Sequence, residues 1–120
     1  MILMNNTVSL ILNPEQIELP EAPAVYAIFS STQCRFVGVS RNLHTAIINH
    51  CSPLEPNVTL RYFMQSNKCK ILLYEILKHE TSSKCDSIRQ TWIELFEPTN
   101  NSESLKNLPS DNNNFRKIIV

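Results

Sequence analysis

The sequence predicts an α+β domain with a small central antiparallel sheet flanked by helices. Two stretches rich in β-branched and aromatic residues, 25–29 and 34–39, lie on either side of a short polar break, as in a β-hairpin. Two later segments, 41–51 and 86–97, repeat apolar residues every three or four positions, which is the helical period. At 120 residues and 42% hydrophobic, the chain is long enough for one compact core.

Residues 1–22 are predicted to form a short edge strand, Val8 to Leu12, and a lead-in loop. The loop is indicated by residues 13–24, which carry three prolines and three glutamates. The apolar run of the strand is too short for a signal sequence or a membrane span, so we expect an intracellular protein.

The hairpin is expected to span 25–39, with its turn at 30–33. Ser40 is predicted to cap a helix that begins at Arg41, and Pro53 is expected to stop that helix. Apolar residues recur at every fourth position on one face of it: Leu43, Ile47 and Cys51.

Two strand-like stretches, 58–64 and 70–77, follow the first helix. The sequence leaves open which of them joins the central sheet and favours the second. A further helix is expected to open at Asp86 or Ser87. Residues 102–120 are predicted to add an Asn-rich loop and a terminal strand, FRKIIV, to the same domain.

Eleven basic and eleven acidic side chains cancel, so net charge provides no general attraction to nucleic acid or membranes. Basic residues nevertheless gather between Arg35 and Lys70, where Glu55 is the only acid. The four cysteines lie 16 to 18 residues apart without a Cys-x-x-Cys pair, which argues against a zinc site and favours reduced thiols.

Two triplets of the hairpin resemble the motif that gives the GIY-YIG nuclease superfamily its name. Residues 24–26, Ala-Val-Tyr, stand for Gly-Ile-Tyr, and residues 36–38, Phe-Val-Gly, stand for Tyr-Ile-Gly. Other residues follow at the family's spacings: Ser40, Asn42, Leu43, His50, Pro98 and Asn101. The resemblance covers about residues 23–101, implies the family's fold there, and is nearest to the plant and cyanobacterial branch, some of whose members are fused to a glutaredoxin.

The resemblance implies a nuclease site in altered form. Family members hold one divalent cation with a Glu of the C-terminal helix, use the Tyr of the first triplet as general base or orienting group, and stabilise phosphate charge with an Arg. By spacing, the Glu position is Arg89 and the Arg position is Ala46. Arginine has no lone pair for a metal. The remaining residues of the vestigial site are Tyr26, His50, Phe36, Gly38 and Asn101, with Gly38 placed where the backbone approaches the contents of the site.

We therefore expect a catalytically degenerate GIY-YIG module that needs no cofactor and binds nucleic acid phosphate weakly. The candidate contacts are Arg35, Arg41, Lys68, Lys70 and Arg89. Each site residue also has an ordinary structural explanation. Tyr26 fits a packed core aromatic, His50 suits the dipole of a helix end, and the stem of Arg89 can pack while its guanidinium reaches solvent.

Two alternatives remain open at the level of sequence. The first is a weak DNA endonuclease that recruits Mg²⁺ or Mn²⁺ through Asp86, one turn before Arg89. The second is a protein-interaction or redox-regulatory domain with a protein partner, in which Cys34 is the thiol of interest. The oligomeric state is left undetermined by the sequence.

Overall fold

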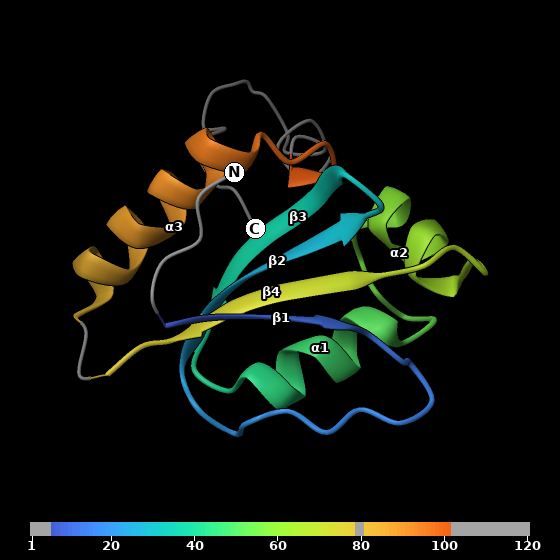
Figure 1. Cartoon of the computed structure of the whole chain (residues 1–120), viewed down its shortest axis with the longest axis horizontal. Helices are drawn as coiled ribbons and strands as arrows, with labels where there is room; N and C mark the ends of the chain where they lie inside the picture. The colour runs from blue at the N-terminus through green and yellow to red at the C-terminus, as the bar shows by residue number, and fades with distance from the viewer. Residues whose placement is uncertain (1–5, 79–80, 102–120) are drawn as a thin grey trace.

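The structure, a computed structural model, describes residues 6–78 and 81–101. It confirms the α+β class, because the described residues form a four-stranded antiparallel sheet and three helices (Figure 1). In chain order the elements are β1 (Thr7–Ile11), β2 (Ala24–Ser30), β3 (Gln33–Ser40), α1 (Leu43–Cys51), α2 (Val58–Gln65), β4 (Ile71–Ile76) and α3 (Ser82–Phe96). The predicted Asn-rich loop and terminal strand at 102–120 lie outside the described residues.

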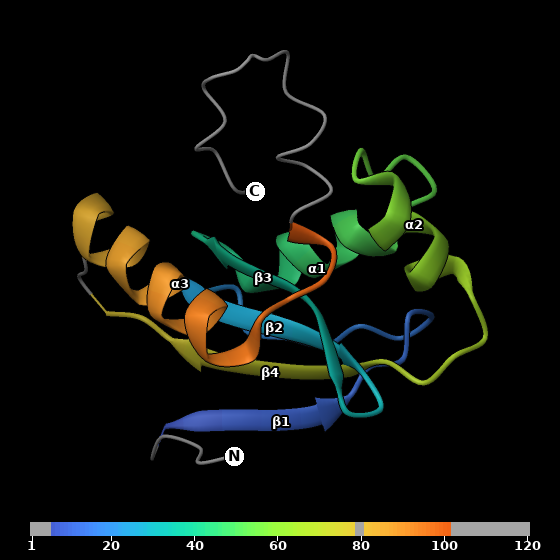
Figure 2. The ribbon, with the colours of Figure 1, turned by 90° about the horizontal axis from the view of Figure 1, so that it is seen from above.

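The strands lie in the order β1-β4-β2-β3, so that β1 and β3 are the edges of the sheet (Figure 2). The predicted edge strand is confirmed with its bounds shifted by one residue, and Leu12 leaves it to enter the core. Of the two candidate strands in the middle of the chain, the favoured one joins the sheet as β4, between β1 and β2.

The β2–β3 hairpin is confirmed, but its loop is shorter than predicted. Ser30 and Gln33 pair with each other, which leaves a two-residue loop of Ser31 and Thr32. Ser31 has a φ of 53°, in the left-handed region that such tight loops need. A bulge at Ile28/Phe29 shifts the register beside the loop.

The prediction of a strand at 58–64 is wrong, because these residues form helix α2. The side chain of Asn57 caps this helix by accepting a hydrogen bond from the backbone N–H of Leu60. Leu60, Phe63 and Met64 lie on one face and are buried, which is helical spacing. The β-branched Val58 and Thr59 that indicated a strand occupy only the first turn.

Both other helices begin at different residues than predicted. The cap of α1 is Asn42, which accepts from the N–H of Thr45, while Ser40 accepts from the N–H of Asn42. The cap of α3 is Thr81, which places its start about one turn earlier than expected. Serines and Thr81 compete for this position locally, and the sequence alone did not separate them.

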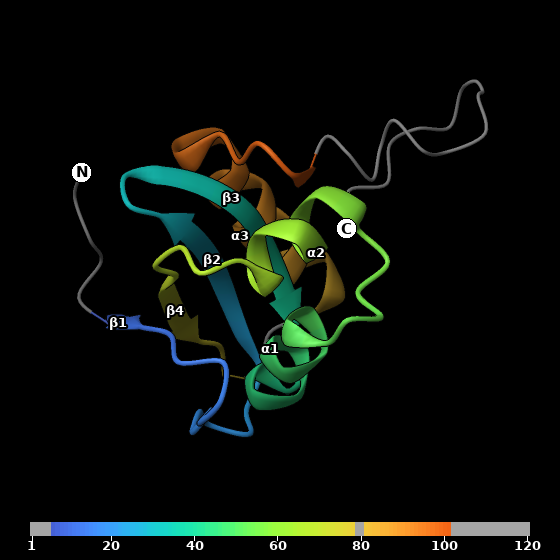
Figure 3. The same ribbon diagram turned by 90° about the vertical axis from the view of Figure 1, so that its right-hand side faces the viewer.

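The helices cover opposite faces of the sheet, with α3 on one side and α1 and α2 on the other (Figure 3). Alternate residues of β2 divide between two cores, so that Tyr26 and Ile28 face α1 and α2, while Val25 and Ala27 face α3. No helix within the described ranges has the length and apolarity needed to cross a membrane.

Candidate functional site

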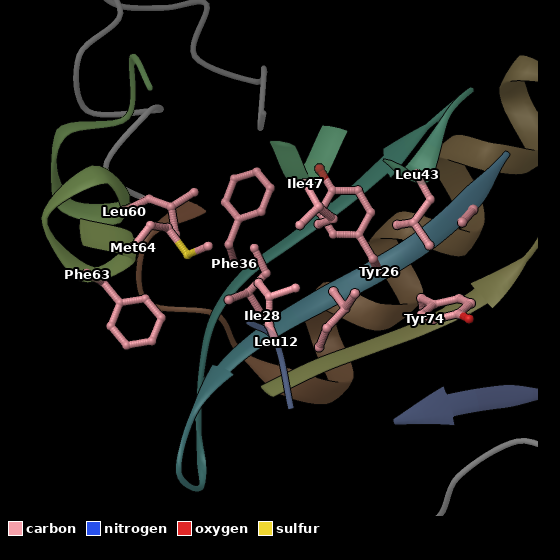
Figure 4. Close-up of a cluster of buried hydrophobic side chains, with 12 residues drawn as sticks. Leu12, Tyr26, Ile28, Phe36, Leu43, Ile47, Leu60, Phe63, Met64 and Tyr74 are labelled. Atoms are coloured by element: carbon pink, nitrogen blue, oxygen red, sulfur yellow. The ribbon is translucent and has the colours of Figure 1, made fainter. Parts of the chain in front are cut away.

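The structure brings together the two predicted site residues Tyr26 and His50. Tyr26 projects from β2 towards α1 (Figure 4). Its hydroxyl oxygen lies 2.7 Å from Nε2 of His50, in the last turn of α1. Tyr26 is 4% exposed, so this hydrogen bond is inside the protein. The expectation of a core aromatic with a satisfied hydroxyl therefore describes this side chain.

Glu55 completes the site and was not among the predicted site residues. Its Oε1 lies 2.5 Å from Nδ1 of His50, and its Oε2 accepts from the N–H of Asn57 at 2.8 Å. Because a carboxylate only accepts, Nδ1 carries a proton, and in the neutral imidazole Nε2 accepts from Tyr26. The available signal was that Glu55 is the one acid in a basic stretch, five residues after His50.

The surroundings of Glu55 and Tyr26 shift the pKa values of these two side chains in opposite directions. Burial raises the pKa of Glu55, but hydrogen bonds from His50 and from the N–H of Asn57 outweigh it and hold that pKa below its usual value. Burial raises the pKa of Tyr26 far above its usual value, the charge of Glu55 adds to this, and the charge of Arg89 opposes it. At neutral pH Tyr26 is therefore a hydroxyl donor beside an ionised Glu55.

Gly38, the only glycine of the chain, lies directly across the hairpin from Tyr26. A Cβ at this position would lie 2.7 Å from the hydroxyl oxygen of Tyr26, 2.8 Å from its Cζ and 3.0 Å from Cε2 of Phe36. The φ of Gly38 is not positive, so conformation does not require glycine here. The backbone at Gly38 lies against the ring of Tyr26. The resemblance had instead implied that it lies against whatever is bound in the site.

Phe36 and Ala46 occupy two positions where the resemblance implies polar site residues, and both contribute to the core on the α1 side of the sheet. The ring of Phe36 lies 4.9 Å from that of His50 and 6.2 Å from that of Tyr26, and Phe36 is 2% exposed. Ala46 packs against the same core from α1. This side of the imidazole is therefore apolar.

The predicted site residue Arg89 lies on α3. Its charge acts on the pKa of Tyr26, and its side chain is 28% exposed. The guanidinium lies 3.9 Å from the carboxylate of Asp86, one turn earlier on the helix and 75% exposed. A pair this long and this exposed is weak. The positive charge of Arg89 therefore acts on Tyr26, and the candidate metal ligand Asp86 is paired with Arg89.

Asn101 has a structural position in the described protein. Its Oδ1 accepts from the N–H of Val37 at 2.8 Å, and its Nδ2 donates to the carbonyl of Val37 at 2.9 Å. Asn101 is 4% exposed, so both bonds are shielded from water. The side chain thereby pairs with the outer edge of β3 as a neighbouring strand would.

The predicted nucleic-acid contacts fall into two groups at opposite ends of β3. Arg41 lies near Asp86, with which it lines a cavity of about 510 Å³ beside the start of α3, and Arg89 is on the same helix. Arg35 lies at the other end, with its guanidinium 5.1 Å from the ring centre of Phe63 in α2. Lys68 is exposed in the loop that follows α2.

Lys70 does not fit the predicted role of a surface contact. It is 4% exposed, and its Nζ donates to the carbonyls of Ser66 and Lys68, at 2.7 Å each. Burial lowers the pKa of Lys70, with a smaller opposing effect of Cys51 and Cys69. Its ammonium is used to hold the loop after α2, which the sequence could not show because both partners are backbone carbonyls.

The donor atoms that could bind a metal near Tyr26 are engaged by the protein itself. Both nitrogens of His50 and both oxygens of Glu55 have hydrogen-bond partners. Within residues 6–78 and 81–101, no three His, Cys, Asp or Glu side chains come together as a metal site would require. Comparisons with known protein families and with curated proteins found no match to this chain.

Proposed function

We propose that this chain is a degenerate GIY-YIG-like module that works inside the cell and binds nucleic acid phosphate without hydrolysing it. The β2–β3 hairpin, α1, β4 and α3 follow one another in the order that the resemblance implies, with the additional helix α2 between α1 and β4. Tyr26 and His50 meet within this arrangement. These features support the proposal, and the positive charge of Arg89 favours binding of phosphate over its hydrolysis.

The observation that carries the proposal is that Arg89 occupies the position where the resemblance implies a carboxylate, and that its charge lowers the pKa of Tyr26. A guanidinium presents up to five N–H donors in a fixed plane, which suits the oxygens of a phosphate and not a metal ion. The carboxylate nearest to Tyr26, that of Glu55, is buried and already occupied by His50 and Asn57. The site therefore offers an anion the cation of Arg89, whereas its buried carboxylate is occupied and the exposed carboxylate of Asp86 is paired with that cation.

Binding of a fluorescent oligonucleotide, followed by anisotropy over a range of salt concentrations, tests the proposal. Wild-type binding is expected to weaken as salt rises, because phosphate contacts release counterions. Arg89→Glu should weaken binding by about tenfold or more, since a charge-assisted hydrogen bond worth about 1.5–3 kcal/mol is lost and a repulsion is added.

The matched control is Lys84→Glu, which makes the same change of charge on α3. Lys84 is exposed and lies five residues before Arg89, which is about 140° around the helix. If both Arg89→Glu and the double variant Arg41→Ala/Arg89→Ala bind the oligonucleotide as tightly as the wild type, the proposed surface is refuted. Nicking of supercoiled plasmid with Mg²⁺ or Mn²⁺ that disappears in Asp86→Ala would instead establish the endonuclease alternative.

A further inference from the structure

We propose that the nucleic acid is bound as a single strand, with one base stacked on the ring of Tyr62 in α2. This inference depends on the proposed function and adds to it the form of nucleic acid that is recognised. It is carried by three features of α2: an exposed aromatic ring, an arginine that contacts this ring, and a surrounding stretch without acidic side chains.

Tyr62 is 70% exposed, and it is the one aromatic side chain of the described residues that is exposed. Its neighbour Phe63 turns inward and is 6% exposed, so α2 places one ring in the core and one in water. A fold that buries or half-buries all its other described rings does not need this one for its core. An exposed ring is available to a planar ligand.

Arg61 connects Tyr62 to the site beside Tyr26. Its guanidinium carbon lies 5.8 Å from the ring centre of Tyr62, and its NH1 donates to the carbonyl of Glu55 at 3.1 Å. Glu55 in turn holds His50 against Tyr26. A continuous series of contacts therefore joins the exposed ring to Tyr26, on which the charge of Arg89 acts.

The charge around α2 favours a polyanion. No acidic side chain occurs between Glu55 and Glu75, and the carboxylate of Glu55 is buried against His50. Three basic side chains that are exposed or half-buried lie on or beside this helix: Arg35, Arg61 and Lys68. Phosphates that reach Tyr62 thus meet these cations, and no acid of residues 56–74 opposes them.

A single strand fits an exposed ring better than a duplex does. Bases in a duplex are stacked on one another and show only their edges in the grooves, whereas unpaired bases expose a π-face that can stack on tyrosine. Stacking tolerates any base, so recognition without sequence preference is expected. Because stacking involves the base and not the sugar, both DNA and RNA single strands are included in the test.

The experiment compares single-stranded DNA, single-stranded RNA and a DNA duplex of the same sequence by anisotropy at one salt concentration. Wild type should bind the single strands more tightly than the duplex. Tyr62→Ala should weaken single-strand binding by about 5- to 100-fold, which corresponds to the usual value of one stacked base, and leave duplex binding unchanged. Tyr62→Phe keeps the ring and should bind as wild type. Leu95→Ala, which removes a 52% exposed apolar side chain from α3, is the control.

The two proposals fail in different ways. If Arg89→Glu loses binding while Tyr62→Ala binds single strands as wild type, base stacking is wrong and phosphate binding stands. A wild-type preference for the duplex also overturns the inference. If the wild type binds none of the three oligonucleotides, the proposed function itself is wrong. Because Tyr62 is exposed, Tyr62→Ala should fold, and circular dichroism checks this.

Discussion

Glu55 accepts two hydrogen bonds at 6% exposure, one from Nδ1 of His50 and one from the backbone N–H of Asn57. The first of these determines which nitrogen of the imidazole carries the proton, and therefore that Nε2 faces the hydroxyl of Tyr26. Both ring nitrogens are thereby used inside the protein. A residue that could serve as a base or as a metal ligand instead links β2, α1 and the start of α2.

Glu55→Gln tests this arrangement through pH. The pKa of Glu55 in the folded protein is below its ordinary value of 4.5, so ionised Glu55 stabilises the fold above pH 4.5, and this contribution is lost as the pH falls through the lowered pKa. At pH 7 the variant should lose about 1–3 kcal/mol of unfolding free energy, because His50 and Asn57 donate to different oxygens of Glu55 and glutamine replaces one of these by an NH2 group that cannot accept.

Urea denaturation over a series of pH values measures the difference between the two proteins. This difference should shrink as the pH falls from 4.5, where Glu55 of the unfolded chain is protonated, through the lowered pKa of Glu55 in the folded protein. Glu18→Gln, at an exposed position, is the control and should behave as wild type. A difference between Glu55→Gln and wild type that is independent of pH would show that ionisation of Glu55 is not the source of its contribution.

At the scale of elements, the segment after α3 is attached to two other elements by asparagines. Asn101 pairs with both backbone groups of Val37 on the edge of β3, and the carbonyl of Asn100 accepts from Nδ2 of Asn57, the cap of α2. Backbone N–H groups of Thr99 and Asn100 donate to carbonyls at the start of β3. The edge of β3 is thus closed by a short segment instead of a strand.

Asn101→Leu should therefore destabilise the fold strongly. It leaves the N–H and the carbonyl of Val37 unpaired in a buried place, which is expected to cost about 2–5 kcal/mol of unfolding free energy. Hydrogen exchange gives the specific measurement, because the amide of Val37 should lose its protection. Asn49→Leu changes an exposed asparagine on α1 and is the control. Unchanged protection of Val37 in Asn101→Leu would contradict this role.

At the scale of the whole molecule, the four cysteines differ in how deeply they are buried. Cys34 lies in the core under α3 at 3% exposure, Cys51 and Cys85 are half-buried, and Cys69 is exposed. Burial raises the pKa of Cys34 to about 12, with a smaller opposing effect of the carbonyl of Phe36. A thiol in this state is a poor nucleophile, which argues against the redox role considered for Cys34.

Alkylation by iodoacetamide at pH 8, followed by mass spectrometry, should reflect this order. Cys69 is expected to react first and Cys34 last, because a thiol with a pKa of about 12 is ionised at about one part in ten thousand at this pH. In urea all four should react at similar rates, which controls for intrinsic reactivity. Labelling of Cys34 in the native protein as fast as that of Cys69 would favour the redox alternative.

Local patterns in the sequence predicted most elements of the fold. The hairpin, β1, β4 and the two helices α1 and α3 all show a period or a turn signal within a few neighbouring residues. Helix α2 was mistaken for a strand because Val58, Thr59, Tyr62 and Phe63 favour strands individually. Burial of Leu60, Phe63 and Met64 against the sheet overrides that preference.

The sequence by itself determined the class of fold, the position of Gly38 in the second strand of the hairpin, and the presence of Arg89 where the family resemblance implies a carboxylate. Only the tertiary structure decided that the ring of Tyr26 fills the space over Gly38, that Glu55 holds His50, and that the basic residues divide between the two ends of β3. The physical reason is the separation along the chain of the residues that interact. Periodicity and caps depend on neighbours along the chain, whereas these contacts depend on how the packed layers bring distant side chains together.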